Sequence, residues 1–321
     1  MTPDATQLTP EALQEKLEPL LASGQAELSA LEVSESDLRV FGFEISDGLV
    51  RIPADVERLE APTILASLSE RAKAWLTDLQ ALEVVGSTNT LLGEVASANA
   101  DHGGAEGAVR IAELQVQGRG RRGRSWQSPY GQNLALSLGV RLPLRPEALG
   151  GYSLCVGLAV ADALQRIGVP DVALKWPNDV LSRGRKLAGI LVEIFGAGSE
   201  TDVVVGTGIN FRIPPEARRE IDQPVIDLEE LGGGFSRNEL AAALISSLVD
   251  FSEGFAETGF APMRHAFDSL HYFHGQTCTL ILGAERLVGS VRGVTSSGEL
   301  ELLVDGEIRT FSAGEVSLRP G

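Results

Sequence analysis

The sequence predicts an α+β fold built around a central mixed or antiparallel sheet. Apolar, strand-like runs follow one another between residues 109 and 210 with few helical segments between them. Parallel neighbours need a long crossover, usually a helix, so short connections favour antiparallel pairing. A helical pattern near the N-terminus and four evenly spaced short strands after residue 275 indicate smaller units on either side. We therefore expect three domains, at residues 1–65, 80–273 and 274–321.

The N-terminal segment predicts two helices and a hairpin. Residues 9–21 have helical periodicity, with Thr9 as the N-cap and Pro10 in the first turn. A short second helix is expected to end near Leu38, and two strand-like runs flank the turn at residues 46–48. Helix, helix and hairpin is the outline of a winged helix-turn-helix. Only a few residues separate VSESDL from the hairpin, which leaves little room for a recognition helix.

The central segment predicts five strands and two helices. The second helix opens with the capping box SRNE at residues 236–239, and residues 182–185 are typical of a hairpin turn. The strands are expected at residues 109–114, 133–140, 172–176, 186–194 and 202–210, and the helices at 149–167 and 236–257. The C-terminal segment holds CTLIL, RLVGSVRGV, ELELLV and EIRTFS, with a tight turn at Asp305 and Gly306, and predicts a small β-barrel.

Charge and composition narrow the class of function. The 321 residues are 43 % hydrophobic and carry a formal net charge of −17, whereas phosphate contacts with nucleic acids need clustered Lys and Arg. Apolar runs stop well short of the roughly 18 residues of a membrane span, and the first 18 residues do not resemble a signal peptide. We expect a soluble, cytoplasmic protein without membrane contact. Cys155 and Cys278 lack metal-ligand spacing and are expected to be buried thiols, and no metal site made of protein ligands is predicted.

Positive charge is nevertheless concentrated in the segment GRGRRGR at residues 118–124. This segment joins two predicted strands, and its glycines allow the backbone to approach a ligand closely. Guanidinium groups and exposed amides suit a di- or triphosphate, although a solvated basic loop has the same composition. The glycine spacing, the aromatic turn that follows and the acidic remainder favour a nucleotide. The sequence has no GxxxxGK[ST], which excludes a Walker-type loop, and no GxGxxG between a strand and a helix.

Two further stretches carry candidate side chains. Lys175 is one of only four lysines and ends a strand at KWPND; it is either a surface lysine or a point charge for a carboxylate or phosphate. Pro177 cannot continue a central strand, so the chain is expected to turn there. Residues 87–89 (STN) are three small hydrogen-bonding residues, which also suit a helix N-cap.

The ordered set STN, QxQGRGRRGRxW, KWPNDV, RKLAGILVE and GTGIN resembles the biotin protein ligases. The resemblance runs from about residue 83 to 211 and more loosely to residue 319; the lipoate ligases share the core fold but not GRGRRGR and KWPND. It implies a class II synthetase-like catalytic core and an SH3-like C-terminal barrel. It also implies that ATP and biotin react, with Mg²⁺, to biotinoyl-5′-AMP, from which biotin passes to a lysine of a biotin carboxyl carrier protein of acetyl-CoA carboxylase.

The resemblance also implies roles for individual residues. Arg121 and Lys175 would be catalytic, Arg121 by holding the adenylate and Lys175 by binding the carboxylate–phosphate junction. The implied biotin-binding residues are Ser87, Thr88, Asn89, Gln115, Arg119, Gly120, Arg121 and Lys175. The implied ATP- and adenylate-binding residues are Arg119, Arg121, Arg124, Trp126, Asn178, Glu315 and Arg319. The base for the acceptor lysine stays open between Asp179 and Asp171.

Some members of this family also bind operator DNA through the N-terminal winged helix. Here residues 1–80 contain 15 acidic and six basic side chains, which opposes phosphate contacts, so we predict a degenerate winged helix that does not bind DNA. The alternatives are a lipoyl or other acyl-protein ligase, a biotin-responsive repressor and an RNA-binding module. A homodimer joined at sheet edges also agrees with the resemblance.

Overall fold

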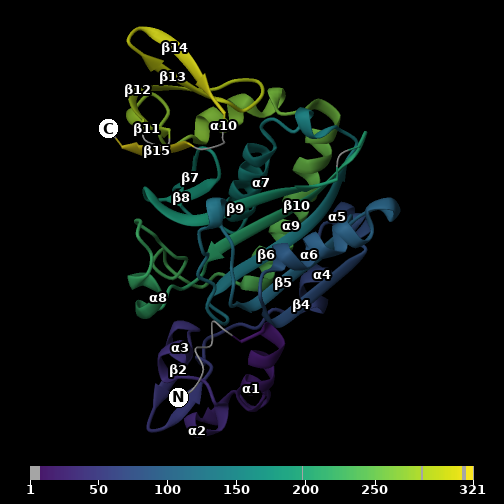
Figure 1. Ribbon diagram of the computed structural model, residues 1–321, viewed down its shortest axis with the longest axis vertical. Coiled ribbons are helices and arrows are strands. Elements are labelled where there is room, and N and C mark those ends of the chain that lie inside the picture. The colour runs from purple at the N-terminus through teal and green to yellow at the C-terminus, as the bar shows by residue number, and fades with distance from the viewer. Residues whose placement is uncertain (1–7, 197, 283–284, 313–315, 321) are drawn as a thin grey trace.

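The computed structural model describes residues 8–196, 198–282, 285–312 and 316–320. Along the long axis of the molecule, helices α1 to α3 lie at one end, a large sheet with its helices lies in the middle, and strands β11 to β15 lie at the other end (Figure 1). Each of these three parts has a sheet of its own.

The N-terminal part is built on three helices and three very short strands. Helix α1 (Pro10–Ser23) begins at Thr9, whose side chain accepts a hydrogen bond from the amide of Ala12, so the predicted helix and cap are confirmed. The predicted hairpin is confirmed as β2 (Glu44–Ser46) and β3 (Leu49–Arg51). Where one second helix was expected, the chain forms α2 (Leu28–Leu31) and α3 (Glu35–Val40), preceded by β1 (Gln25–Glu27). Elements this short carry too few periods of hydrophobic pattern to be recognised in a sequence.

The central sheet has seven strands in the order β4-β5-β6-β10-β9-β8-β7. Only the pair of β4 and β5 is parallel, so the predicted mixed sheet is confirmed. The strands are β4 (Asp78–Val85), β5 (Ala108–Gln115), β6 (Asn133–Leu142), β7 (Val172–Lys175), β8 (Asp179–Ser182), β9 (Arg185–Phe195) and β10 (Thr201–Asn210). All five predicted strands are present. Strands β4 and β8 were not predicted; β8 is only four residues long and forms a hairpin with β9.

Helices cover both faces of this sheet. The two predicted helices are confirmed as α7 (Tyr152–Arg166) and α9 (Arg237–Thr258), which pack together on the face that carries Val203 and Val205. Helix α6 (Thr88–Ala98) begins directly after Ser87, as the alternative of a helix N-cap at residues 87–89 implied, and packs on the opposite face against Val204. Because alternate residues of a strand point to opposite faces, the face of α6 is also the face of Gly206 and Gly208. The remaining helices, α4 (Ala61–Ser67), α5 (Glu70–Trp75), α8 (Pro215–Arg219) and α10 (Arg264–Leu270), were not predicted.

The C-terminal part is an antiparallel sheet in the order β14-β13-β12-β11-β15. The four predicted strands are confirmed as β11 (Thr277–Leu282), β12 (Glu285–Val294), β13 (Leu300–Val304) and β14 (Glu307–Phe311). A fifth strand, β15 (Val316–Pro320), returns to pair with β11. Cys155 and Cys278 are buried and free, as expected. Within the described ranges, no helix has the length and apolar character needed to cross a membrane.

Candidate functional site

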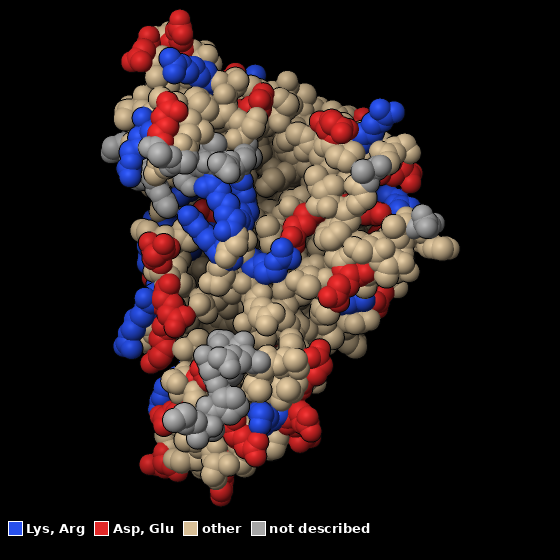
Figure 2. All heavy atoms as spheres, viewed as in Figure 1, with Lys and Arg blue, Asp and Glu red and all other residues tan. Residues whose placement is uncertain are grey.

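A pocket opens on the α6 face of the central sheet and gathers the residues singled out in the sequence. The face of the molecule in Figure 2 has a group of Lys and Arg side chains beside a hollow, whereas Asp and Glu are scattered over the rest. Among the residues predicted for the site, those that line the pocket are Ser87, Thr88, Asn89, Gln115, Arg119, Gly120, Arg121, Arg124, Trp126, Lys175 and Asn178. Glu315 lies outside the described residues. Arg319 belongs to β15 and pairs with Thr279, but its side chain is also outside the described part.

One end of the pocket is a closed network of small polar side chains at the start of α6. Ser87 is the N-cap residue of α6 but makes no side-chain cap bond, so the STN segment both begins a helix and faces the pocket. Thr88 donates from its amide and its hydroxyl to Gln115 Oε1, at 2.9 and 3.1 Å. Ser137 Oγ on β6 lies 2.7 Å from Thr88 Oγ1 and 2.6 Å from Asn89 Oδ1. Ser87, Thr88, Asn89 and Ser137 are buried, which suits recognition of a small polar head group.

The floor of the pocket is a stretch of sheet without side chains. A Cβ atom on Gly206 would lie 2.1 Å from Asn89 Oδ1, and one on Gly208 would lie 2.4 Å from Trp126 Cε2. The bare backbone therefore lets the indole of Trp126 approach the sheet closely, with Lys186 Nζ 5.4 Å from the ring centroid. The GTGIN motif thus makes room for the side chains that approach from the other elements.

The arginine-glycine loop (residues 116–125) crosses the mouth of this pocket between β5 and β6. It is held by backbone bonds from the Gly120 amide to Arg124 and from the Trp126 amide to Gly118. Arg121 donates to Asn178 Oδ1 at 3.1 Å, which joins the loop to the KWPND turn. Burial, and the neighbouring Arg122, lower the pKa of the Arg121 guanidinium from its usual value. Arginine nevertheless stays charged at neutral pH, and a partly buried charge of this kind favours an anionic partner.

The KWPND turn supplies the opposite wall. Strand β7 ends at Lys175 and β8 begins at Asp179, so the chain turns at the proline, as expected. Asp179 forms an ion pair with Lys186 Nζ at 2.8 Å, and both side chains line the pocket. Asp171, the other carboxylate considered as a base, is not part of the described lining; it lies in an exposed turn 3.8 Å from Arg183.

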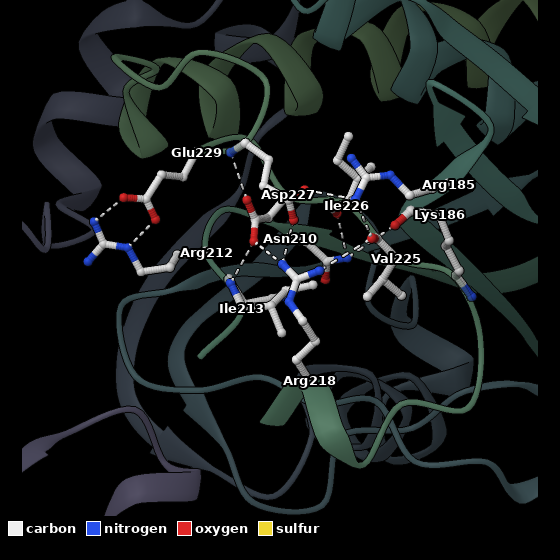
Figure 3. Close-up of polar contacts among 12 residues, drawn as sticks. Arg185, Lys186, Asn210, Arg212, Ile213, Arg218, Val225, Ile226, Asp227 and Glu229 are labelled. Atoms are coloured by element: carbon white, nitrogen blue, oxygen red, sulfur yellow. Dashed lines mark hydrogen bonds and ion pairs between the residues drawn. The ribbon is translucent and has the colours of Figure 1, made fainter. Parts of the chain in front are cut away.

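A polar network supports the same wall from behind (Figure 3). The segment at residues 224–226 adds to the edge of β9 through backbone bonds between Lys186 and both Pro224 and Ile226. Buried Asp227 accepts hydrogen bonds from the amides of Ile213 and Glu230 and from Arg218. Lys186 joins this network only through its backbone, and Figure 3 shows its side chain pointing away. The network therefore fixes the strand that presents Lys186 to the pocket.

The C-terminal sheet also reaches the site. The indole of Trp176, which is fully buried, donates to the carbonyl of Gly298 in the turn between β12 and β13 at 3.1 Å. Gly298 packs so closely on Gly151 at the start of α7 that an added Cβ would lie 2.5 Å from its Cα. Leu318 on β15 belongs to the pocket lining. The KWPND turn is therefore held from both the central and the C-terminal sheet.

Sequence reasoning missed several lining residues, which include Ser137, Lys186 and Gln223. Ser137 is an ordinary serine within a strand pattern, so no local signal marks it. Lys186 could have been selected, since it is one of four lysines and lies within RKLAGILVE. In the part of the chain that is described, no group of three or more His, Cys, Asp or Glu could hold a metal ion.

Comparison with known proteins gives one consistent family. The Biotin/lipoate A/B protein ligase family matches residues 81–210, and the biotin protein ligase C-terminal domain matches residues 273–319. The bifunctional ligase/repressor BirA of Escherichia coli is 39 % identical over 84 % of this chain and 80 % of its own length. A biotin–[acetyl-CoA-carboxylase] ligase of Mycobacterium tuberculosis is 36 % identical over 82 % of this chain and 98 % of its own.

A solved structure gives the same result. The biotin protein ligase from Aquifex aeolicus in complex with biotin and ATP aligns over 77 % of this chain and 99 % of that chain, with a TM-score of 0.62 and 28 % identity. Together with the two curated relatives, it shows that the chain belongs to the biotin protein ligase family.

Proposed function

We propose that this protein is an ATP-dependent biotin protein ligase. The observation that carries the proposal is the juxtaposition, in one pocket, of the buried polar network at α6 and the arginine-glycine loop. Such a pocket has a neutral, hydrogen-bonding end for an uncharged head group and a cationic end for phosphates. An acid that carries a polar head and a carboxylate can therefore meet a nucleotide between the two ends.

The neutral end would bind the ureido group of biotin. Ser87, Thr88, Asn89 and Gln115 present hydroxyl and amide groups there, and Ser137 fixes Thr88 and Asn89. An uncharged urea needs both donors and acceptors at short range, which hydroxyls and amides provide. A polar site of this kind rejects analogues that leave its groups unpaired.

The cationic end would perform the first step. A carboxylate oxygen of biotin attacks the α-phosphorus of ATP, the bond to the pyrophosphate oxygen breaks, and biotinoyl-5′-AMP and pyrophosphate result. Negative charge builds up on the oxygens of the α-phosphate and on the pyrophosphate that leaves. We assign its stabilisation to Arg119, Arg121, Arg124 and Lys175, together with Lys186, because preorganised cations in a partly dry site stabilise such charge better than water does. The indole of Trp126 would pack against the adenylate.

The second step would transfer biotin to protein. The amine of the acceptor lysine attacks the carbonyl carbon of the mixed anhydride, the bond to the phosphate oxygen breaks, and AMP leaves. The sequence left two carboxylates as candidates for the base, and Asp179 is the one that lines the pocket. We therefore propose that Asp179 accepts the proton of the attacking amine. We propose the biotin carboxyl carrier protein of acetyl-CoA carboxylase as the acceptor. Closure of the arginine-glycine loop would exclude water from the anhydride until the acceptor arrives.

Magnesium is proposed to accompany the nucleotide. Asp179 is the one carboxylate in the described lining, and it is paired with Lys186. Mg²⁺ at phosphates is typically held through one or two protein oxygens, with the rest of its ligands from the nucleotide and water, so Asp179 and Asn178 fit as its protein ligands. When bound, the ion would neutralise charge on the pyrophosphate.

Isotope exchange between pyrophosphate and ATP tests the proposal directly. We expect exchange that depends on biotin and does not occur with lipoate. We also expect the Arg121→Gly variant to exchange more slowly, because one stabilising cation is gone, but still to form biotinoyl-5′-AMP and release it, so that lysines of bystander proteins are labelled. Exchange with lipoate alone would assign the protein to the lipoate ligases, and exchange with neither acid would refute the adenylation chemistry.

For the N-terminal part, we propose a degenerate winged helix that does not bind DNA. The order of helices and strands suits a winged helix, and α3 occupies the place of a recognition helix, but it is only six residues long and begins with Glu35 and Asp37. Its Arg39 is paired with Glu35, and Lys16 is paired with Glu32. Cations that are already paired with carboxylates would displace few counterions from DNA phosphates, so they would contribute little to DNA binding. A tight, salt-sensitive gel shift with the promoter of the biotin operon would refute this proposal.

The same reasoning divides the chain into the winged helix at residues 1–65, the catalytic domain at 80–273 and an SH3-like barrel at 274–321. These boundaries are proposals that limited proteolysis can test, because exposed segments between domains are cleaved first. Edge-to-edge homodimerisation stays a prediction, which sedimentation in the presence and absence of biotin and ATP can check.

A further inference from the structure

Glu193 lies beside the pocket, on the same face of the sheet, and contacts two parts of the pocket that are far apart in the sequence. Its Oε2 accepts hydrogen bonds from Asn89 Nδ2 at 2.9 Å and from Arg119 Nη1 at 3.1 Å, and its Oε1 accepts from Arg119 Nη2 at 2.7 Å. Asn89 belongs to the first turn of α6, whereas Arg119 belongs to the arginine-glycine loop. We propose that Glu193 is a positioning residue that couples the loop to the acid-binding end of the pocket. This inference rests on the proposed function.

The side chain of Asn89 has one orientation in this arrangement. Its Oδ1 faces Ser137 Oγ, while its Nδ2 donates to Glu193 and to the carbonyl of Leu191 at 3.3 Å. Exchanging the oxygen and nitrogen of the amide would turn a donor toward Ser137 and an acceptor toward a carboxylate and a carbonyl. Glu193 and Leu191 therefore fix which group Asn89 presents to the pocket.

The contact of Glu193 with Arg119 restricts a side chain of the arginine-glycine loop. The guanidinium meets the carboxylate through two nitrogens, which is the geometry that restricts an arginine most strongly. Without this partner, a side chain that is 47 % exposed would occupy many rotamers, and a ligand would have to order it on binding. Glu193 thus holds in place a cation that the proposed chemistry needs.

The exposure of Arg119 and Glu193 indicates that their ion pair positions a side chain rather than stabilises the fold. The side chains of Arg119 and Glu193 are 47 % and 22 % exposed, and ion pairs this close to solvent contribute little to folding. Replacing the carboxylate by an amide of the same size should leave the melting temperature nearly unchanged. Biotin binding should weaken, because a glutamine cannot accept from both the Asn89 amide and the two guanidinium nitrogens.

A double-mutant cycle within two backgrounds tests the coupling. Isothermal titration calorimetry would give the Kd for biotin of the wild type, Asn89→Ala, Arg119→Ala and the double variant, and then of the same four in the Glu193→Gln background. If Glu193 couples the two side chains, the effect of the double variant on the Kd differs by about fivefold or more from the product of the two single effects when Glu193 is present. In the Glu193→Gln background, it equals that product within about twofold. Glu200→Gln is the matched control, because Glu200 is an exposed carboxylate in the turn that joins β9 to β10 and is not part of the pocket lining.

The outcomes are distinct from those of the proposed function. If the wild type does not bind biotin, the proposed function fails before this inference is reached. Additive effects in the presence of Glu193, or equal non-additivity in both backgrounds, would overturn the inference. If Glu193→Gln does not fold, as judged by circular dichroism, the cycle is repeated with Glu193→Asp. Loss of the fold in both variants would also overturn it, because the carboxylate would then serve stability.

Discussion

Gly206→Ala is expected to disable the acid-binding end of the pocket while sparing the rest of the sheet. Gly206 lies on β10 opposite Ser137 and Leu191, and a Cβ there would lie 2.1 Å from Asn89 Oδ1. Carbon and oxygen atoms approach no closer than about 3.3 Å, so the Asn89 amide would have to retreat by about 1.2 Å.

That displacement has a cost that the structure allows to be estimated. Moving the amide lengthens its contacts with Ser137 Oγ and the Leu191 carbonyl, now at 2.6 and 3.3 Å, beyond hydrogen-bonding distance. Displaced in this way, the amide can no longer contact biotin; leaving a buried polar group of the complex unpaired costs about 2 kcal/mol, which corresponds to a Kd for biotin raised about 30-fold.

Calorimetric titration with biotin measures this change. Gly198→Ala is the control, because its Cβ would meet nothing closer than the Glu200 carbonyl at 3.6 Å; its Kd should stay within about twofold of the wild type. A Gly206→Ala variant that is folded and binds biotin within about threefold of the wild type would refute the assignment of Asn89 to the acid-binding end.

Three further predictions concern stability. His271 is 4 % exposed and its ring nitrogens have no hydrogen-bond partner among the described residues; burial lowers its pKa to about 3. The unfolded chain therefore takes up a proton below pH 6.5 that the folded chain does not. As the pH is lowered from 7.5 to 5, the free energy of unfolding should fall by about 2 kcal/mol. Urea unfolding should show that this fall is absent in His271→Phe. Arg237→Met should lower the free energy of unfolding by about 3–5 kcal/mol, because it leaves Glu113 buried without its 2.7 Å partner; partial recovery on adding Glu113→Gln is the check. Trp176→Phe should lower it by about 1–3 kcal/mol, because the carbonyl of Gly298 loses its donor; an unchanged urea midpoint would contradict this.

Sequence periodicity predicted the longest elements of the fold; among the short ones it predicted β7 and the β2–β3 hairpin but missed several others. Strands such as β6 and β10 and helices such as α7 and α9 run for ten residues or more, so their hydrophobic pattern repeats often enough to be recognised. Strand β8, with four residues, and helix α3, with six, do not offer that repetition. Helix α6 was foreseen only through the N-cap at residues 87–89, because its first turn carries polar residues that face the pocket.

The resemblance to the biotin protein ligases could be recognised in the linear sequence, because GRGRRGR and KWPND are continuous strings that need no fold to be read. Which side chains act together depends on the tertiary fold. Glu193 meets Asn89 and Arg119 across three elements, and Ser137 reaches α6 from a strand that begins 35 residues after the helix ends. Contacts of this kind follow from sheet order and from the absence of a side chain at Gly206, and neither leaves a local pattern in the sequence.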